Sequence, residues 1–288
     1  MKKLNKISSL LTLSLVIMMA VPTVSMGAQP TVKLGTTSSF AVLAGSAITN
    51  TGNTTISGNA GGDIGMAPGT EFTKNGPVTM SGTVHLPPDA LALRAKNDLV
   101  TAYNDAAGRT PVTTIPSELG GTTLKPGTYD SIDGTFEITG ALTLDAENDP
   151  NGVFVFKMAS TLKTASGSKV NLIKSARPCQ VFWQVGSSAT LGTTSAFVGH
   201  IFAMQSITAT TGATIQGQLL ARNGAVTLDN NTITNVLCAT TATTASIAPT
   251  VTGGKLPKTS TPLFDLFLLG GALTLAGALG WKNRKRFA

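Results

Sequence analysis

The chain has 288 residues, of which 12% are charged and 42% hydrophobic, too little charge and too much apolar content for a disordered chain. Abundant Thr and Gly disfavour a helical bundle, because they displace the residues that form helices best. The formal charge of +7 comes from the two ends, since residues 29–255 hold 13 basic and 13 acidic residues, and this neutral body gives no electrostatic reason to expect a nucleic-acid partner.

The first 27 residues have the three parts of a secretory signal peptide. Three lysines precede an apolar run from Leu10 to Ala20, and small residues follow up to Gly27. The alternative is a membrane anchor, but a span needs about 20 apolar residues and this run is shorter. We therefore expect residues 1–27 to direct export and residues 28–238 to form the folded domain.

Residues 88–108 are predicted to form one long helix. Pro88 and Asp89 suit its first turn, and Gly108 suits its end. A single apolar stripe at helical spacing indicates that the helix lies along a larger body. The residues of this stripe are Leu91, Ala95, Leu99, Ala102, Tyr103 and Ala106.

The remainder of the body predicts a repeating β structure. Thr followed by Leu or Ala recurs at spacings of 18, 29, 18 and 19 residues, at Thr143, Thr161, Thr190, Thr208 and Thr227. The longest step contains an insertion at residues 173–180. A period near 18 fits one coil of a β-solenoid with three short faces, whereas a propeller blade would need more than twice that length.

Such a solenoid buries alternate residues of every strand in a common core. Burying each large aliphatic side chain contributes roughly 1.5–3 kcal/mol, and several coils must stack because one coil cannot form a core alone. The side chains expected in the core are Leu144, Leu162, Leu191, Ile207, Ile215, Leu228 and Ile233.

Little in the sequence indicates catalysis, a metal or a cofactor. The two histidines, His85 and His200, lie in no metal-binding or nucleophile motif. The acidic group around Glu147 is more typical of a solvated turn than of a cation site. We therefore predict a protein that is not an enzyme.

Cys179 and Cys238 are the only cysteines. Export permits a disulfide between them, which would tie the 173–180 insertion to the end of the solenoid and stabilise the fold by about 4 kcal/mol in the chain-entropy model. The alternative is two buried thiols, because a sequence does not give the distance between the Cα atoms.

The end of the chain has a modular order. Residues 239–255 are rich in Thr, Ala, Pro and Gly and are predicted to form an extended stalk. An apolar segment at 263–281 and a basic tail follow the motif Leu256-Pro257-Lys258-Thr259-Ser260. This order resembles the sorting signal by which sortase joins surface proteins of Gram-positive bacteria to peptidoglycan, although Ser260 replaces the usual Gly. The alternative is plain membrane anchoring through residues 263–281.

Six blocks of the body carry a resemblance to a known family. They are residues 34–58, 95–109, 124–130, 140–156, 181–201 and 221–233. In this order they resemble the secreted ice-binding protein family of microbes. The resemblance covers residues 34 to about 238 and implies a discontinuous right-handed β-helix of triangular section with a long α-helix alongside.

The resemblance gives a meaning to the 39 threonines between residues 31 and 252, which strand preference alone would otherwise explain. A solenoid face holds outward side chains on a grid of about 4.7–4.9 Å between strands, close to the oxygen repeat of ice. Some relatives carry a four-residue pattern, T-A/G-x-T/N, on that face. It occurs here from Thr51, Thr208 and Thr211, where chance matches are also expected.

The resemblance thus implies an ice crystal surface as the partner, bound through a flat Thr-rich face. The predicted outward members are Thr190, Thr208, Thr210 and Thr227, followed by Thr161 and Thr193. Lys163 and Lys169 make the coil at residue 161 the least suited. The rival interpretation is a structural or adhesive surface module that binds a glycan or a protein, which a Thr face studded with charges would favour.

Overall fold

The computed structural model describes residues 29–238. The predicted signal peptide, the stalk, the motif at 256–260 and the apolar segment at 263–281 lie outside these residues. Within the described range, no helix is both long enough and apolar enough to span a membrane.

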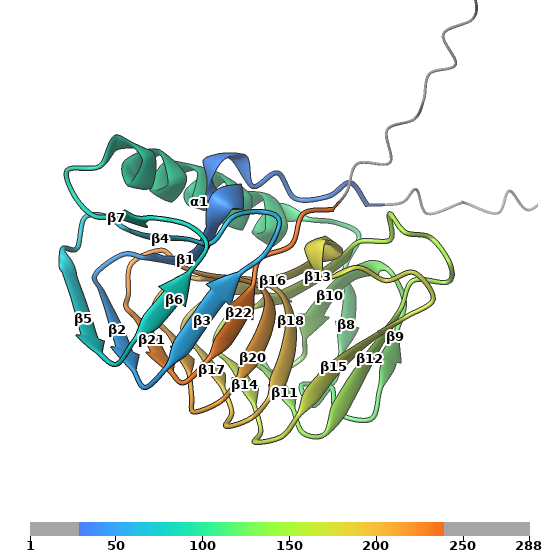
Figure 1. Ribbon diagram of the computed structural model, residues 1–288. Coiled ribbons are helices and arrows are strands. Elements are labelled where there is room, and N and C mark those ends of the chain that lie inside the picture. Colours follow the sequence, from blue (N-terminus) through green and yellow to red (C-terminus); the bar gives the residue numbers. More distant parts are fainter. Residues whose placement is uncertain (1–28, 239–288) are drawn as a thin grey trace, which may run out of the picture. The chain divides into compact units, whose positions relative to one another are not determined.

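Parallel strands stack in coils with three faces, as predicted for a solenoid (Figure 1). The first face, called here the helix face, lies under the helix α1 (Ala90–Gly108). In stacking order its strands are β7 (Val84–His85), β4 (Asp63–Met66), β1 (Phe40–Ala44), β20 (Thr214–Ala221), β18 (Ala196–Ala203), β16 (Val181–Val185), β13 (Phe154–Met158), β10 (Gly127–Ser131) and β8 (Thr113–Ile115).

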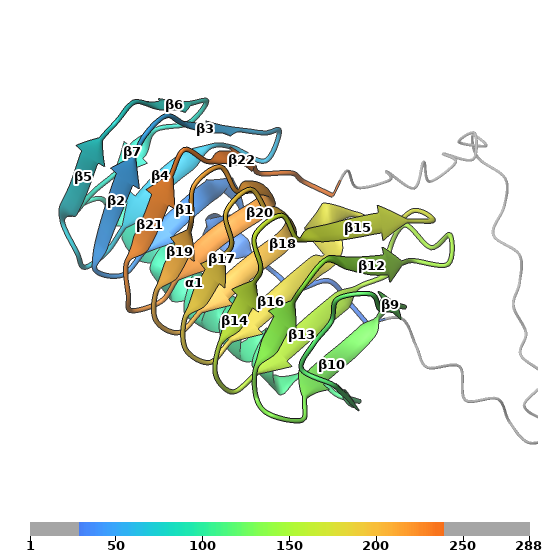
Figure 2. The ribbon, with the colours of Figure 1, turned by 90° about the horizontal axis from the view of Figure 1, so that it is seen from below.

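The second face, called here the seven-strand face, is a separate sheet that is seen from its outer side in Figure 2. Its strands are β5 (Glu71–Asn75), β2 (Ala47–Thr51), β21 (Val226–Asp229), β19 (Ile207–Ala209), β17 (Ala189–Leu191), β14 (Leu162–Thr164) and β11 (Phe136–Ile138).

The third face faces the viewer in Figure 1. It contains the N-terminal parts of β20 and β18 together with β6 (Val78–Met80), β3 (Thr54–Ser57), β22 (Thr232–Thr234), β15 (Lys169–Ile173), β12 (Ala141–Asp145) and β9 (Thr123–Leu124). The strands β18 and β20 bend from this face onto the helix face at Gly199 and Gly217, which pair in register and have φ of 114° and 150°. A Cβ on Gly217 would lie 2.0 Å from the Gly199 carbonyl oxygen, so no other residue fits there.

The order of coils in the stack differs from their order in the chain. The strands β1, β2 and β3 pair with β20, β21 and β22, so the N-terminal coils extend the stack beyond the C-terminal one. The chain then passes from β7 through α1 (Ala90–Gly108) along the length of the stack and re-enters it at β8 (Figures 1 and 2). This arrangement is the discontinuous β-helix that the resemblance to the ice-binding family implied.

The interior of the stack is filled by alternate side chains of every strand. All seven side chains predicted for the core are at most 1% exposed, which confirms the alternation. Aromatic side chains fill part of this interior, where Trp183 stacks on Phe156 with ring centroids 3.9 Å apart. Large buried apolar side chains from all three faces therefore supply the cohesion of the fold.

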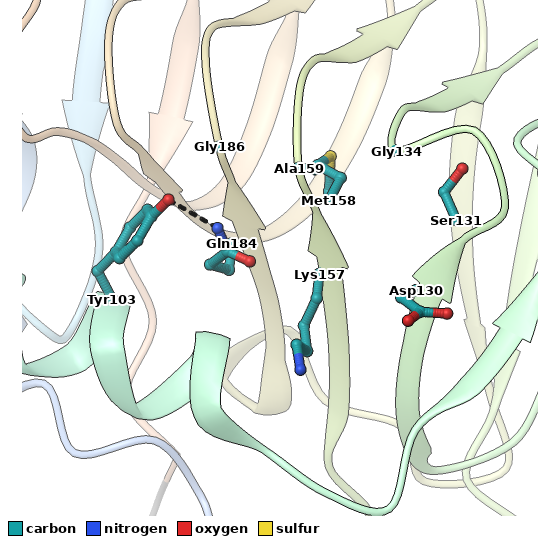
Figure 3. A pocket seen from close by; sticks show the side chains of 9 residues that line it. All are labelled: Tyr103, Asp130, Ser131, Gly134, Lys157, Met158, Ala159, Gln184 and Gly186. Atoms are coloured by element: carbon teal, nitrogen blue, oxygen red, sulfur yellow. Dashed lines mark hydrogen bonds between the residues drawn. The ribbon is translucent and has the colours of Figure 1, made fainter.

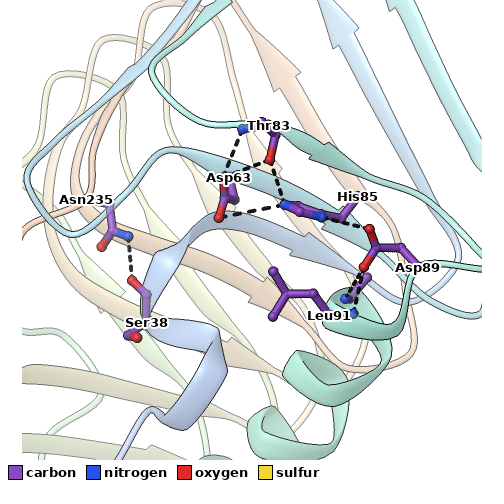
Figure 4. A network of polar contacts seen from close by, with 8 residues as sticks. Ser38, Asp63, Thr83, His85, Asp89, Leu91 and Asn235 are labelled. Atoms are coloured by element: carbon purple, nitrogen blue, oxygen red, sulfur yellow. Dashed lines mark hydrogen bonds and ion pairs between the residues drawn. The ribbon is translucent and has the colours of Figure 1, made fainter.

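The helix begins at Ala90, two residues later than predicted. Asp89 has an extended backbone, and its side chain accepts hydrogen bonds from the amides of Leu91, at 2.7 Å, and Ala92, at 3.1 Å. The other carboxylate oxygen of Asp89 accepts from His85 Nδ1 at 2.9 Å (Figure 4), and these hydrogen bonds, led by that from His85, lower the pKa of Asp89. Asp89 is thus the N-cap residue of α1 and not part of its first turn.

The apolar stripe of α1 packs on the helix face as predicted. Ala95, Leu99 and Ala102 are fully buried against outward side chains of the sheet such as Phe182 and Phe202. Among the predicted stripe residues, only Leu91 remains partly exposed. Lys96 also lies on the buried side, where its Nζ donates to the carbonyls of Ala221, at 2.7 Å, and Arg222. Burial lowers the pKa of Lys96 to about 8.

A disulfide joins Cys179 to Cys238, with the Cα atoms 5.3 Å apart. Cys179 belongs to a short 3-10 helix, η2 (Pro178–Gln180), inside the predicted insertion between β15 and β16. A second 3-10 helix, η1 (Gly35–Ser39), precedes β1. The bridge spans 59 residues of sequence, so it restricts the unfolded chain over several coils.

Candidate functional site

A straight column of threonines runs across the seven-strand face. Thr190 pairs in register with Thr208, Thr208 with Thr227, Thr227 with Thr49, and Thr49 with Thr73. Their neighbours along the strands, among them Ile207, Val226 and Ile48, are buried in the core, so the threonines point outward. We call these five residues the first threonine column. They present one methyl and one hydroxyl group per strand at the strand spacing of about 4.8 Å.

Charged side chains lie at the two ends of this column. Beyond Thr190 the register continues to Lys163 and Glu137, whose charged groups are 3.7 Å apart at the surface. At the other end, Glu71 lies beside Thr73 and accepts a hydrogen bond from its hydroxyl at 3.1 Å. The strands β17, β19, β21 and β2 between these ends carry one charged residue, Asp229, at the end of β21.

The corner between the seven-strand face and the third face is held by its own hydrogen bonds. Thr210 Oγ1 donates to the carbonyl of Leu191 at 2.7 Å and lies 3.3 Å from the hydroxyl oxygen of Thr193. Asp229 accepts from the Thr211 hydroxyl. Inside the corner, the buried Asn231 side chain donates to the carbonyl of Thr210 at 2.9 Å. This network fixes the angle between the two faces and restrains the hydroxyls of Thr210 and Thr211.

The predicted residues divide into three groups. Thr190, Thr208 and Thr227 belong to the first threonine column. Thr193 and Thr210 lie at the corner, where Thr193 is exposed and Thr210 half-buried. Thr161 does not join either group.

The repeat of Thr followed by Leu does not place Thr161, which was predicted as an outward member, or Thr143 in the first threonine column. Leu162 pairs with Ala189, so Lys163, and not Thr161, lies opposite Thr190. Thr143 belongs to β12 on the third face, where it pairs with Asn171. Because a Thr-Leu pair places a leucine in the core on any face, the pair repeats through the chain without marking one column.

The four-residue pattern noted in the sequence also spans more than one environment. Thr54, the last residue of the pattern that starts at Thr51, is fully buried and accepts a hydrogen bond from the Asn231 amide at 3.2 Å. The pattern that starts at Thr211 runs from the corner to Thr214 on the third face. Only Thr208 begins the pattern in the first threonine column.

Thr49 and Thr73 were missed by sequence reasoning. Both belong to the N-terminal coils, and these coils join the column only because the chain places them beside β21. The segment 47–51 does resemble segment 225–229 in its alternation of Thr with a core residue, which is the signal that could have found Thr49.

The two histidines of the described part of the chain lie away from the column. His85 contacts Thr83 Oγ1 at 2.7 Å with one ring nitrogen and Asp89 with the other (Figure 4). Because Asp89 is the N-cap residue of α1, these contacts stabilise the beginning of the helix. His200 is fully buried. Within residues 29–238, no three side chains of His, Cys, Asp or Glu are placed to hold a metal ion.

An open pocket is lined by residues of α1, β10, β13 and β16 (Figure 3). Gln184 Nε2 donates to the Tyr103 hydroxyl oxygen at 2.7 Å, and Lys157 Nζ donates to the Arg109 carbonyl at 3.2 Å. These contacts connect the sheet to the helix and to its C-cap residue.

Comparison with known proteins agrees with this architecture. The family model described as ice-binding-like matches residues 42–234. The chain belongs to this ice-binding-like family. A relative from Nostoc, named ice-binding protein, is 41% identical over 256 residues, which are 88% of this chain and 87% of the relative.

Solved structures of the ice-binding-like family have the same fold. The crystal structure of an ice-binding protein from an Antarctic biological consortium matches with a TM-score of 0.68 and 46% identity, covering 73% of this chain and 92% of its own. The structure of an ice-binding protein from the ascomycete Antarctomyces psychrotrophicus matches with a TM-score of 0.66 and 39% identity, covering 72% and 100%. The predicted family and fold class are confirmed.

Proposed function

We propose that the protein is a non-catalytic, exported protein that binds ice through the first threonine column. The observation that carries the proposal is the register of Thr190, Thr208, Thr227, Thr49 and Thr73 on an outward face whose charged side chains, apart from Asp229 at the end of β21, lie at the two ends of the column. Membership in a family whose relatives are named ice-binding protein supports the ligand. The protein would adsorb to the ice surface and slow the growth and recrystallisation of ice, with no covalent bond made or broken.

The physical basis is a rigid array of weak contacts. Each threonine methyl group orders water and each hydroxyl can anchor it, and one residue alone contributes little. The core beneath the column fixes every backbone position, so the contacts add without a large cost in ordering the protein. The charged pair of Lys163 and Glu137 would hold water in its own geometry, so the ice contact would end at Thr190.

We further propose that the folded domain is displayed at the surface of a Gram-positive cell. Support comes from the sequence alone: the signal-peptide pattern of residues 1–27, the stalk at 239–255 and the LPKTS motif with its apolar segment. Sortase would join the chain to peptidoglycan at this motif, or residues 263–281 would hold it in the membrane. Many copies on one wall would bind an ice crystal multivalently, so that cells attach to ice or shield their envelope.

The test is inhibition of ice recrystallisation by the purified protein and by Thr208→Tyr. The bulky ring in the middle of the column should hold ice away from its neighbours and lower the activity at least twofold, whereas thermal unfolding should stay nearly unchanged. Thr101→Tyr is the matched control, because Thr101 is exposed on α1 and away from the column. Normal crystal coarsening with micromolar unaltered protein would instead favour the adhesive module that binds a glycan or protein.

A further inference from the structure

The third face carries a second column of registered threonines. Thr214 pairs with Thr232, Thr232 with Thr55, and Thr55 with Thr79. The next residues along the first three strands, Ile215, Ile233 and Ile56, are at most 1% exposed, so the threonines point away from the core. We call Thr214, Thr232, Thr55 and Thr79 the second threonine column.

The second column shares the in-register pairing and the outward direction of the first threonine column, and its side chains are more exposed. All four of its threonines are exposed, whereas in the first column Thr190 is exposed and the other four are half-buried. Two positions further along the first three strands lie Gln216, Thr234 and Ser57, which pair with one another in register and are uncharged. The register continues from Thr214 to Ala196 and only then reaches a charge, at Lys169.

The corner joins the two columns rigidly at an angle. Thr214 follows Thr208 by six positions and Thr55 follows Thr49 by six positions, so the same coils carry both columns. The buried side chains of Asn231 and Asn50 donate to backbone carbonyls of the turns between them. The two faces are therefore separate sides of the prism, and one flat crystal plane can contact only one of them at a time.

We infer that the third face is a second ice-binding surface, so that the protein adsorbs to ice in either of two orientations. The inference rests on the proposed function, because it assigns the same ligand to a further face. The helix face has no such role, since α1 covers it. Two surfaces that meet at a corner would also let one molecule sit at a step between two ice planes and pin both.

The experiment compares Thr232→Tyr, Thr208→Tyr and the double variant, with Thr55→Tyr as a second substitution in the second column. Recrystallisation inhibition and the planes labelled on a single ice crystal by fluorescently tagged protein are measured. We expect each single variant to need about two- to tenfold more protein for inhibition and to lose a different labelled plane. The double variant should lose at least a hundredfold. Thr101→Tyr should match the unaltered protein, and circular dichroism confirms that each variant is folded.

The outcomes separate this inference from the proposed function. If Thr232→Tyr and Thr55→Tyr behave like Thr101→Tyr while Thr208→Tyr removes all activity, the second surface is wrong and the proposed function stands. If the unaltered protein neither inhibits recrystallisation nor labels any plane, the proposed function itself is wrong. Complete loss with Thr232→Tyr alone, with Thr208→Tyr fully active, would overturn the assignment of two surfaces and leave the third face as the single one.

Discussion

The helix face and the seven-strand face belong to the same coils but carry different outward side chains. In β16, Val181, Trp183 and Val185 point into the core, whereas Phe182 points outward and is 1% exposed because α1 and its neighbours cover it. In β17 the corresponding outward residue is Thr190, which faces solvent. The helix face is thus buried on both sides of its sheet, and the seven-strand face on one.

The difference shows that the inward residues form the core of the solenoid, whereas the outward residues determine what each face can bind. Apolar outward residues pack against a helix and increase the free energy of unfolding. Threonines add little to it and remain available to a ligand. Substitutions on the two faces should therefore separate stability from ice binding.

The largest expected effect is on the helix face. Leu99 is fully buried between α1 and the sheet, so Leu99→Ala should lower the free energy of unfolding by about 3 kcal/mol through lost burial and a cavity. Below the unfolding transition, the activity on ice should be unchanged. Urea denaturation measures the loss, with Leu93→Ala as the control, because Leu93 is 58% exposed on the same helix. Equal stability of the two variants would mean that α1 contributes nothing to the fold.

A smaller effect on the helix face depends on pH. His200 stacks on Phe182 with ring centroids 5.2 Å apart, and burial lowers the pKa of His200 from 6.5 to about 4. Between these values the unfolded chain binds a proton that the folded chain does not, so stability falls as the pH falls from 6.5 toward 4. The loss should reach about 2 kcal/mol at pH 5.

Comparison with His200→Gln isolates this contribution. The variant should lack that part of the decrease in stability between pH 7 and pH 5, whatever its stability at pH 7. Urea denaturation at the two pH values provides the measurement. If both proteins lose stability equally, the proton uptake on unfolding does not belong to His200. Thr208→Tyr, by contrast, should keep the full dependence of the unaltered protein, because the seven-strand face buries no titratable group in its first threonine column.

Much of the fold could be predicted because its physical causes are local. Alternation of Leu or Ile with Thr forces one set of side chains inward, and the stripe that includes Leu99 forces a helix onto a larger body. The resemblance to ice-binding proteins then supplied the discontinuous order of the coils. The start of the helix was misplaced because Asp89 acts as its cap, which depends on a carboxylate geometry that the sequence does not show.

The site was predictable only in part, because strand register is set by contacts between distant segments. Thr190, Thr208 and Thr227 were found since they lie in consecutive coils of similar length. Thr49 joins Thr227 across 178 residues of sequence, a pairing that no periodicity contains. The second threonine column was missed for the same reason, because half of it comes from the N-terminal coils.

The smallest expected effect on stability comes from extending the first threonine column. Lys163→Thr would add a sixth threonine next to Thr190 and remove an exposed ion pair with Glu137 that contributes at most about 1 kcal/mol. We expect roughly half the protein concentration to suffice for recrystallisation inhibition, because the uncharged array grows by one strand. Lys125→Thr is the control, since it removes a similarly exposed pair, with Glu147, and extends no column. If Lys163→Thr weakens inhibition while Lys125→Thr does not, the charged pair at the end of the column takes part in binding. Ice would then be held by polar contacts at the edge of the face and not by the threonine array.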